Sequence, residues 1–127
     1  MNRTLVIITH GRFGEELLKS TSMIIGKMKN TLTFSLTEET APEQFISEIT
    51  SELAKHEGKK LILVDLFGGT PFNTAAYLLQ NEEVDIITGV NLPLVIESYN
   101  EFIENGNDDI QSLLMIGKES IRHLNKI

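Results

Sequence analysis

Two ionisable side chains in this chain directly follow short aliphatic segments. His10 is separated from the run Leu5–Ile8 by Thr9 alone. Asp65 immediately follows the run Leu61–Val64. A neutral imidazole can act as a nucleophile through one ring nitrogen when the other nitrogen keeps its proton. A carboxylate that accepts a hydrogen bond from Nδ1 would leave Nε2 free to attack, so His10 and Asp65 are the candidates for a nucleophile and its orienting group.

Both residues also have purely structural interpretations. Loop histidines often have no chemical role, so the position of His10 does not by itself establish one. A carboxylate beside an apolar strand needs a partner, because burial without one is costly. That partner is either the His10 imidazole or the backbone N–H groups of the glycine turn that follows, and these residues alone leave both alternatives open.

A glycine turn begins three residues after Asp65. Gly68, Gly69 and Thr70 precede Pro71, which favours the first turn of a helix. Backbone amides in such a turn, together with a helix N-terminus, favour an anionic phosphoryl group. The structural alternative is a tight turn in which Thr70 caps the helix. Neither the P-loop nor the dinucleotide glycine pattern occurs, which disfavours nucleotide chemistry.

The remaining candidates have simpler explanations. His56 lies at the end of a predicted helix and His123 lies in a charged C-terminal segment, so surface roles are favoured for both. The acidic pairs 15–16 and 108–109 fall where first helical turns are expected, and acids stabilise such positions. The absence of cysteine excludes disulfides, thiol nucleophiles and cysteine-ligated metals. No two of the three histidines share a helical turn, which disfavours an all-histidine metal site. We expect neither a metal nor a cofactor.

Composition indicates one globular domain spanning residues 1–127. Hydrophobic residues make up 41% of the chain, enough for a continuous core. The net charge of −7 argues against nucleic acid or an anionic membrane surface as the main partner. The aliphatic run near the N-terminus, Leu5–Ile8, is too short for a signal sequence or a membrane span, so a cytoplasmic location is expected.

Periodicity predicts strands that alternate with helices. Expected strands are 4–9, 31–36, 61–67 and 84–88, and expected helices are 13–27, 42–57, one beginning near Pro71, one beginning near Pro93 and a last one beginning near Asp108. This order predicts an α/β fold: an open, mostly parallel, doubly wound sheet of four strands with helices on both faces. In such sheets, functional residues gather beyond the carboxyl ends of the strands.

Three strand-end motifs together carry a resemblance to a known family. They are Thr9-His10-Gly11, the segment from Val64 to Asn73 (VDLFGGTPFN), and the segment from Gly89 to Pro93 (GVNLP). In type, order and spacing they resemble the IIA domains of the mannose-type (mannose/fructose/sorbose) sugar phosphotransferase system. The likeness extends over essentially the whole chain, and the joint occurrence of the three motifs is far more specific than any one of them.

The resemblance implies a phosphoryl carrier. His10 would accept a phosphoryl group from the carrier protein HPr and pass it to a IIB component, which serves the membrane components IIC and IID. Asp65 would orient the histidine. A homodimer is also implied, in which a short antiparallel C-terminal strand crosses to the partner. Residues 121–124 are the candidate strand, although their local pattern reads as continued helix. Leu66 departs from the family pattern, because many relatives have a hydroxyl residue there. Leucine cannot assist the phosphoryl group with a side-chain hydroxyl, so backbone amides and Thr70 would contribute more to binding that group.

Two other functions are compatible with these motifs. The first is a regulatory binding module in which phosphorylation of His10 signals sugar supply to a separate target. The second is an α/β domain whose glycine turn holds a phosphate-bearing metabolite. Ligand binding that survives replacement of His10 would favour the second.

Overall fold

The computed structural model describes residues 2–80 and 83–126. Within these residues, four parallel strands form one sheet in the order β2-β1-β3-β4. The strands are β1 (Arg3–His10), β2 (Thr31–Leu36), β3 (Lys59–Val64) and β4 (Val84–Thr88). The helices are α1 (Phe13–Ile25), α2 (Pro42–Leu53), α3 (Gly69–Tyr77), the short 3-10 helix η1 (Leu78–Gln80), α4 (Leu92–Ser98), the π-helix η2 (Tyr99–Glu104) and α5 (Ile110–Glu119). The predicted α/β fold with helices on both faces is confirmed.

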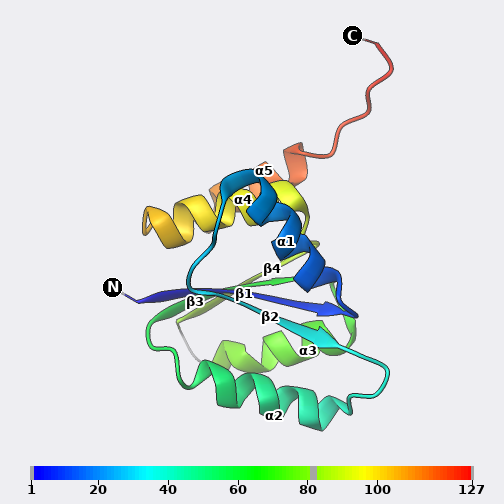
Figure 1. Cartoon of the computed structure of the whole chain (residues 1–127), viewed down its shortest axis with the longest axis vertical. Helices are drawn as coiled ribbons and strands as arrows, with labels where there is room; N and C mark the ends of the chain where they lie inside the picture. Colours follow the sequence, from blue (N-terminus) through cyan, green and yellow to red (C-terminus); the bar gives the residue numbers. More distant parts are fainter. Residues whose placement is uncertain (1, 81–82, 127) are drawn as a thin grey trace.

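One face of the sheet packs against α1, α4 and α5 (Figure 1). Successive side chains of a strand point to opposite faces, so Leu5 and Ile7 of β1 enter the same core. They join Leu17 of α1, Leu94 of α4 and Leu113 of α5. The aliphatic run that the sequence showed in β1 therefore serves two cores rather than one.

The opposite face packs against α2 and α3 (Figure 1). Val6 and Ile8 of β1 point this way and join Phe45 and Ile49 of α2, together with Ala75 of α3. Because the central strands are covered on both sides, their carboxyl ends are held in fixed positions relative to each other. Those ends carry the candidate site.

The strand expected at residues 61–67 ends earlier, at Val64. Residues 65–68 bend away from the sheet. The His10 backbone N–H, on the side of β1 that faces β3, donates to the Asp65 carboxylate at 2.9 Å. At this point the Asp65 carboxylate, instead of a backbone carbonyl of β3, accepts the hydrogen bond from β1. The sequence prediction was wrong here because Leu66 and Phe67 are apolar in type but exposed in the structure.

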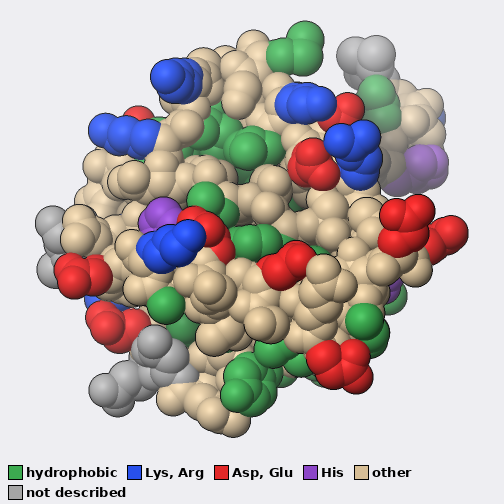
Figure 2. Space-filling model, turned by 60° about the horizontal axis from the view of Figure 1, so that its bottom comes forward, with side chains coloured by type: hydrophobic (Ala, Val, Ile, Leu, Met, Phe, Trp, Pro, Cys, Tyr) green, Lys and Arg blue, Asp and Glu red, His purple; other side chains and the backbone are tan. Residues whose placement is uncertain are grey.

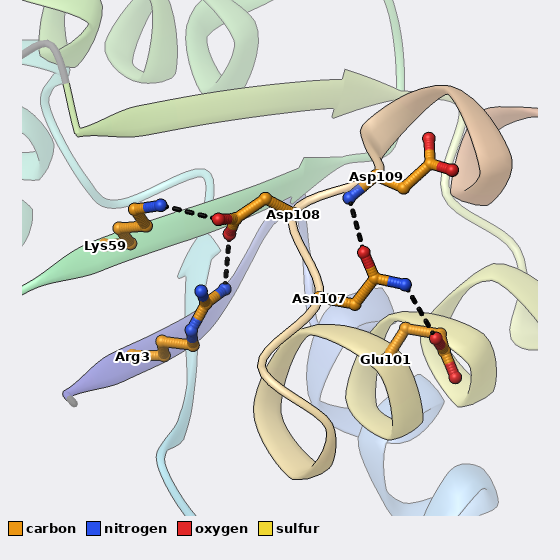
Figure 3. A network of polar contacts seen from close by, with 6 residues as sticks. All are labelled: Arg3, Lys59, Glu101, Asn107, Asp108 and Asp109. Carbon is orange, nitrogen blue, oxygen red and sulfur yellow. Dashed lines mark hydrogen bonds and ion pairs between the residues drawn. The ribbon is translucent and has the colours of Figure 1, made fainter.

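A polar network joins the segment before α5 to the amino ends of β1 and β3 (Figure 3). Asp108 pairs with Arg3 of β1 and with Lys59 of β3, each at 2.6 Å. Hydrogen bonds from Arg3 and Lys59 lower the pKa of Asp108 to about 2. The Arg3 guanidinium also lies 4.8 Å from the centre of the Phe102 ring. The last helix, expected to begin near Asp108, starts at Ile110 with Asp109 as its N-cap residue, so Asp108 lies just before the helix.

The C-terminal segment after α5 extends away from the body of the molecule (Figure 1). Residues 121–124 form neither a helix nor a strand within the chain. Ile121 and Leu124 are 80% and 74% exposed, so two apolar side chains of this segment have little contact with the body. The antiparallel strand expected here stays a prediction.

The surface is mixed in character. On the face shown in Figure 2, acidic and basic side chains lie interspersed, with apolar side chains exposed between them. No helix within the described part of the chain combines the length and the apolar character that crossing a membrane requires.

Candidate functional site

The carboxyl ends of β1 and β3 lie side by side at the topological switch point of the sheet, where the order of the strand connections reverses. From β1 the chain passes through α1 to β2 on one side, and from β3 it passes through α3 to β4 on the other. The two helices lie on opposite faces of the sheet (Figure 1), which opens a crevice between the strand ends. His10 is the last residue of β1, and Asp65 is the first residue after β3. Topology therefore brings together the two candidates that stand 55 positions apart in the sequence.

Asp65 holds His10 through one oxygen atom. Oδ2 lies 2.9 Å from Nδ1 of the imidazole and also accepts the His10 backbone N–H at 2.9 Å. An ionised carboxylate only accepts hydrogen bonds, so this contact places the proton on Nδ1 and leaves Nε2 with its lone pair. The His10 side chain is 50% exposed, whereas that of Asp65 is 15% exposed. Of the two partners considered for Asp65, the imidazole is the one that the structure shows.

Thr9 fixes the backbone next to His10. Its side chain is fully buried, and Oγ1 accepts the Gly14 backbone N–H at 2.9 Å. The Gly11 backbone N–H donates to the Leu36 carbonyl at 2.7 Å, which continues the pairing with β2 one residue beyond β1. Gly11 has a φ of +56°, a conformation that favours glycine, and the chain turns there into α1. His10 is thus an exposed side chain on a rigid backbone.

The glycine turn lies against the free edge of the imidazole. Gly68 and Gly69 have φ values of +113° and +86°. A methyl group built on Gly69 would lie 3.4 Å from both Cε1 and Nε2 of His10. Helix α3 starts at Gly69, and Gly68 at its N-cap offers no side-chain cap. The first turn of α3 therefore keeps its amide donors close to Nε2, where an anion would be stabilised.

The role expected of Thr70 as a helix cap was wrong. Thr70 is the second residue of α3, because the helix begins one residue earlier than Thr70. Glycine permits this early start, since Gly68 adopts a backbone conformation (φ +113°, ψ 165°) that other residues avoid. Thr70 stays a candidate for phosphoryl binding together with Gly68 and Gly69. Pro71 lies in the first turn of α3, as predicted.

A hollow of about 460 Å³ lies on the β2 side of His10. Its lining consists of His10, Gly11, Leu36, Thr37 and Glu38. The imidazole thus stands between the hollow on one side and the glycine turn on the other. Half of the side chain stays open to solvent, so a macromolecular partner could reach Nε2 directly.

A second carboxylate, Glu15 in the first turn of α1, is bound to β2. Ser35 of β2 donates a hydrogen bond to Glu15 Oε2 at 2.7 Å. The Arg12 Nε atom lies 3.6 Å from the same oxygen. The Ser35 hydrogen bond, assisted by the Arg12 charge, lowers the pKa of Glu15. Sequence reasoning assigned Glu15 only a helix-dipole role. The link to Ser35 spans two elements and has no local signal, whereas the spacing of three residues between Arg12 and Glu15 could have indicated their contact.

The other histidines lie apart from this crevice. His56 follows the end of α2, where Nε2 lies 3.2 Å from Glu52 Oε2. His123 belongs to the exposed C-terminal segment. Within the described ranges, no group of three or more histidine, aspartate or glutamate side chains is arranged to hold a metal ion.

The sequence pattern of one protein family matches residues 4–113 of this chain. That family is described as the PTS system fructose IIA component (EIIA-man). The chain belongs to this family. The matched range contains His10, Asp65 and the glycine turn. The family that the three strand-end motifs predicted is therefore confirmed.

Relatives with assigned names belong to sugar phosphotransferase systems. The IIA domain is 32% identical over 129 residues to the mannose-specific EIIAB component of Escherichia coli. That match covers 89% of this chain but 40% of the relative, so the chain spans less than half of that protein. The fructose-specific EIIA component of Bacillus subtilis is 33% identical over 99 residues, covering 74% of this chain and 66% of the relative.

Solved structures agree with this membership. The mannose/sorbose-specific IIA subunit from Enterococcus faecalis superposes with a TM-score of 0.90 at 29% identity, covering 100% of this chain and 98% of that one. A IIA protein associated with the fucose utilization operon of Streptococcus pneumoniae gives a TM-score of 0.87 at 25% identity, with coverage of 97% and 93%. The present IIA domain therefore shares its fold with both proteins over nearly all of its length.

The third motif of this IIA domain stabilises the scaffold. Asn91 caps α4, where its Oδ1 accepts the Leu94 backbone N–H at 3.0 Å. Its Nδ2 donates to the Gly117 carbonyl and to Ser120 Oγ, each at 3.1 Å. The motif after β4 thus joins two helices and does not contact His10 through these bonds. An asparagine two residues before Pro93 already signals a helix start, but the contacts with α5 have no local sequence signal.

Proposed function

We propose that this chain is a phosphoryl carrier of a sugar phosphotransferase system, with Nε2 of His10 as the acceptor. Phospho-HPr would donate the phosphoryl group to His10. His10 would then pass it to a IIB component, which in turn serves the membrane components IIC and IID. One observation carries the proposal: Asp65 Oδ2 binds both Nδ1 and the backbone N–H of His10, each at 2.9 Å. Family membership supports the same role.

The transfer requires one bond to break and one to form. The lone pair of Nε2 attacks the phosphorus of the donor phosphohistidine. The donor N–P bond breaks, its electrons return to the donor ring, and a new Nε2–P bond forms. Positive charge develops on the His10 ring, and the Asp65 carboxylate stabilises that charge through Nδ1–H. The second transfer, to IIB, repeats these events with His10 as the donor.

The protein mainly supplies position and charge in this mechanism. Phosphoryl transfer spreads negative charge over three oxygen atoms and needs the two nitrogen atoms in line. The uncapped first turn of α3 provides amide donors near Nε2, and Gly69 leaves room beside the ring. Exposure of half of the His10 side chain allows two different proteins to reach the same nitrogen in succession.

The test is phosphorylation by the reconstituted relay. The protein is incubated with phosphoenolpyruvate, enzyme I and HPr, and its intact mass is measured without acid. We expect one acid-labile phosphoryl group that is lost in His10→Gln but retained in His56→Gln, followed by transfer to a cognate IIB. Absence of the adduct from folded protein would overturn the carrier function. Binding of a phosphate-bearing metabolite that survives His10→Gln would then favour the metabolite-binding alternative.

The same experiment separates a carrier from a regulatory module. A phosphorylated protein that gives no phosphoryl group to any IIB component, but binds another target, would support regulation instead. For the relay we propose a cytoplasmic location and a single IIA domain over residues 1–127. The sugar is left open, because the named relatives differ in it: mannose, fructose and sorbose all occur among them.

We also propose that the domain is a homodimer, as its resemblance implied. Strand β4 is an outer strand of the sheet, and an apolar groove of about 350 Å³ lies beside it between α3 and α5. Phe67, Phe72 and Leu114 are among its lining residues. The exposed side chains of Ile121 and Leu124 would enter the partner's groove. Sedimentation should show a dimer for the wild-type chain and a monomer for the double variant Ile121→Asp, Leu124→Asp; an unchanged dimer would exclude this interface.

A further inference from the structure

The surroundings of His10 are acidic, although its proposed cargo is an anion. Asp65, Glu15 and Glu38 all lie on or near the rim of the crevice. A bound phosphoryl group adds about two negative charges at neutral pH. None of the described residues that line the hollow beside His10, and none of residues 65–71, is a lysine or an arginine. A cationic side chain that adds to the amide donors of α3 would therefore come from outside these segments.

Arg12 is placed to supply that cation. It is the N-cap residue of α1 and follows His10 by two positions, so the two Cα atoms lie at most about 7 Å apart. Its side chain is 79% exposed and is free to turn. Apart from Gly11 and its neighbours His10 and Arg12, no described residue has an atom within 4 Å of a methyl group built on Gly11, so no third residue fills the space beside this glycine.

The contact that Arg12 makes in the unphosphorylated chain is loose. Its Nε lies 3.6 Å from Glu15 Oε2, too far for a good hydrogen bond. The same oxygen is held firmly by Ser35 Oγ at 2.7 Å. Ser35 thus fixes Glu15 to β2 independently of Arg12. Departure of Arg12 would leave Glu15 with a hydrogen bond and with access to water.

We propose that Arg12 exchanges its contact with Glu15 for the phosphoryl oxygens when His10 is phosphorylated. This inference rests on the proposed function of His10. Arg12 is thereby a phosphoryl-contacting residue of this relay, and Glu15, positioned by Ser35, competes with the phosphoryl oxygens for its guanidinium. Arginine suits this role because its planar guanidinium donates two parallel hydrogen bonds to phosphoryl oxygens.

The expected effect is modest because the arginine is exposed. Exposed ion pairs change equilibria by about two- to fivefold, and salt screens them. We therefore expect Arg12→Gln to lower the rate of His10 phosphorylation about two- to fivefold at low salt, with a smaller difference at high salt. Arg12→Lys should retain part of the rate, because it keeps the charge but loses the paired donors.

The experiment uses potassium phosphoramidate as the phosphoryl donor. Its P–N bond breaks, ammonia leaves, and the Nε2–P bond forms, so no donor protein has to dock. Initial rates are measured by intact mass, and the phosphohistidine is observed by phosphorus NMR. Lys19→Gln is the matched control: Lys19 also pairs with a glutamate three residues away on α1, at 3.0 Å, and is 73% exposed. Its removal makes the same charge change about two helical turns farther along α1.

Glu15→Gln tests the exchange itself. If Glu15 only competes with the phosphoryl oxygens for Arg12, the variant should be phosphorylated at least as fast as wild type. The double variant with Arg12→Gln should then behave like Arg12→Gln alone. The phosphorus resonance should shift in Arg12→Gln and stay in place in Lys19→Gln. Equal rates and resonances in the wild type, Arg12→Gln and Lys19→Gln would overturn the inference, as would a slow Glu15→Gln.

Failure of the relay would look different from failure of this inference. A wild-type protein that reacts with phosphoramidate at His10 but never with phospho-HPr would sink the carrier function and leave the Arg12 comparison intact. A wild-type protein that reacts with both, together with an Arg12→Gln variant indistinguishable from it, would retain the carrier function and remove Arg12 from the site.

Discussion

Replacement of Gly69 by alanine tests whether the glycine turn faces the reactive nitrogen. The new methyl group would lie 3.4 Å from Nε2 and Cε1 of His10, in the space where a phosphoryl group on Nε2 needs room. Gly68→Ala is the matched control, because alanine keeps the backbone N–H through which Gly68 would contact a phosphoryl group. Gly68 also has a positive φ, of +113°, but a methyl group there has no described atom within 4 Å. The two variants share backbone strain and differ in their contact with the imidazole.

The two effects have separable magnitudes. A residue forced into a glycine conformation loses about 1–3 kcal/mol of stability, so both variants should unfold more easily by a similar amount. Displacement of a reacting group by about 1 Å can lower a rate by about 10²-fold. The methyl group beside Nε2 must move the phosphoryl group, the ring or the turn. We therefore expect Gly69→Ala, and not Gly68→Ala, to slow phosphorylation about 10- to 100-fold.

The assay combines urea unfolding with initial rates of phosphorylation by phospho-HPr. Rates are compared at a temperature where both variants are folded, so that stability does not enter the comparison. Equal slowing in both variants would show that strain in the turn, rather than contact with His10, controls the rate. A Gly69→Ala variant as fast as wild type would refute the placement of the phosphoryl group beside this turn.

Three further predictions address the supports of the site. Asp65→Asn removes the charge that stabilises the His10 ring, so phosphorylation should fall about 10²-fold by intact mass, whereas Asp85→Asn on β4 should have no effect. Arg3 and Lys59 lower the pKa of Asp108 from 3.8 to about 2, so its ion pairs stabilise the fold above pH 4. In urea titrations Asp108→Asn should have a lower free energy of unfolding than wild type, and this difference should shrink as the pH falls toward 2. Asn91→Ala should lower stability by about 0.5–2 kcal/mol, and Asn91→Asp, which keeps the α4 cap but loses the donors to α5, should lose less.

The sequence predicted the parts of this molecule that depend on local pattern. The bounds of β2 and β4 were predicted as the structure has them. The β4 segment is rich in β-branched residues and ends at Gly89, a clear turn residue. The two apolar strands placed His10 and Asp65 at neighbouring strand ends but left the partner of Asp65 open, and the structure shows the His10 imidazole in that role. The end of β3 was misplaced because the side chains of Leu66 and Phe67 suggested a strand, whereas the Asp65 carboxylate ends the pairing.

Contacts between distant segments had no local signal. The ion pair of Arg3 with Asp108 joins residues 105 positions apart, and Glu15 meets Ser35 across two elements. Local pattern offered the same explanation for both acids, a favourable position near a helix start. The structure shows that each is instead half of a specific contact, which only the packing of helices onto the sheet creates.

The openness of the site suits the proposed relay. A carrier that bound its phosphoryl group in a closed, strongly stabilising pocket would release it slowly, because tight binding of the intermediate raises the barrier to the next transfer. Here the nitrogen that would react is oriented firmly from one side by Asp65, while half of the imidazole side chain stays exposed. The cation that we assign to the phosphoryl group is also exposed and loosely held. In the proposed relay, firm orientation with weak, screened stabilisation would let the same histidine serve first as acceptor and then as donor.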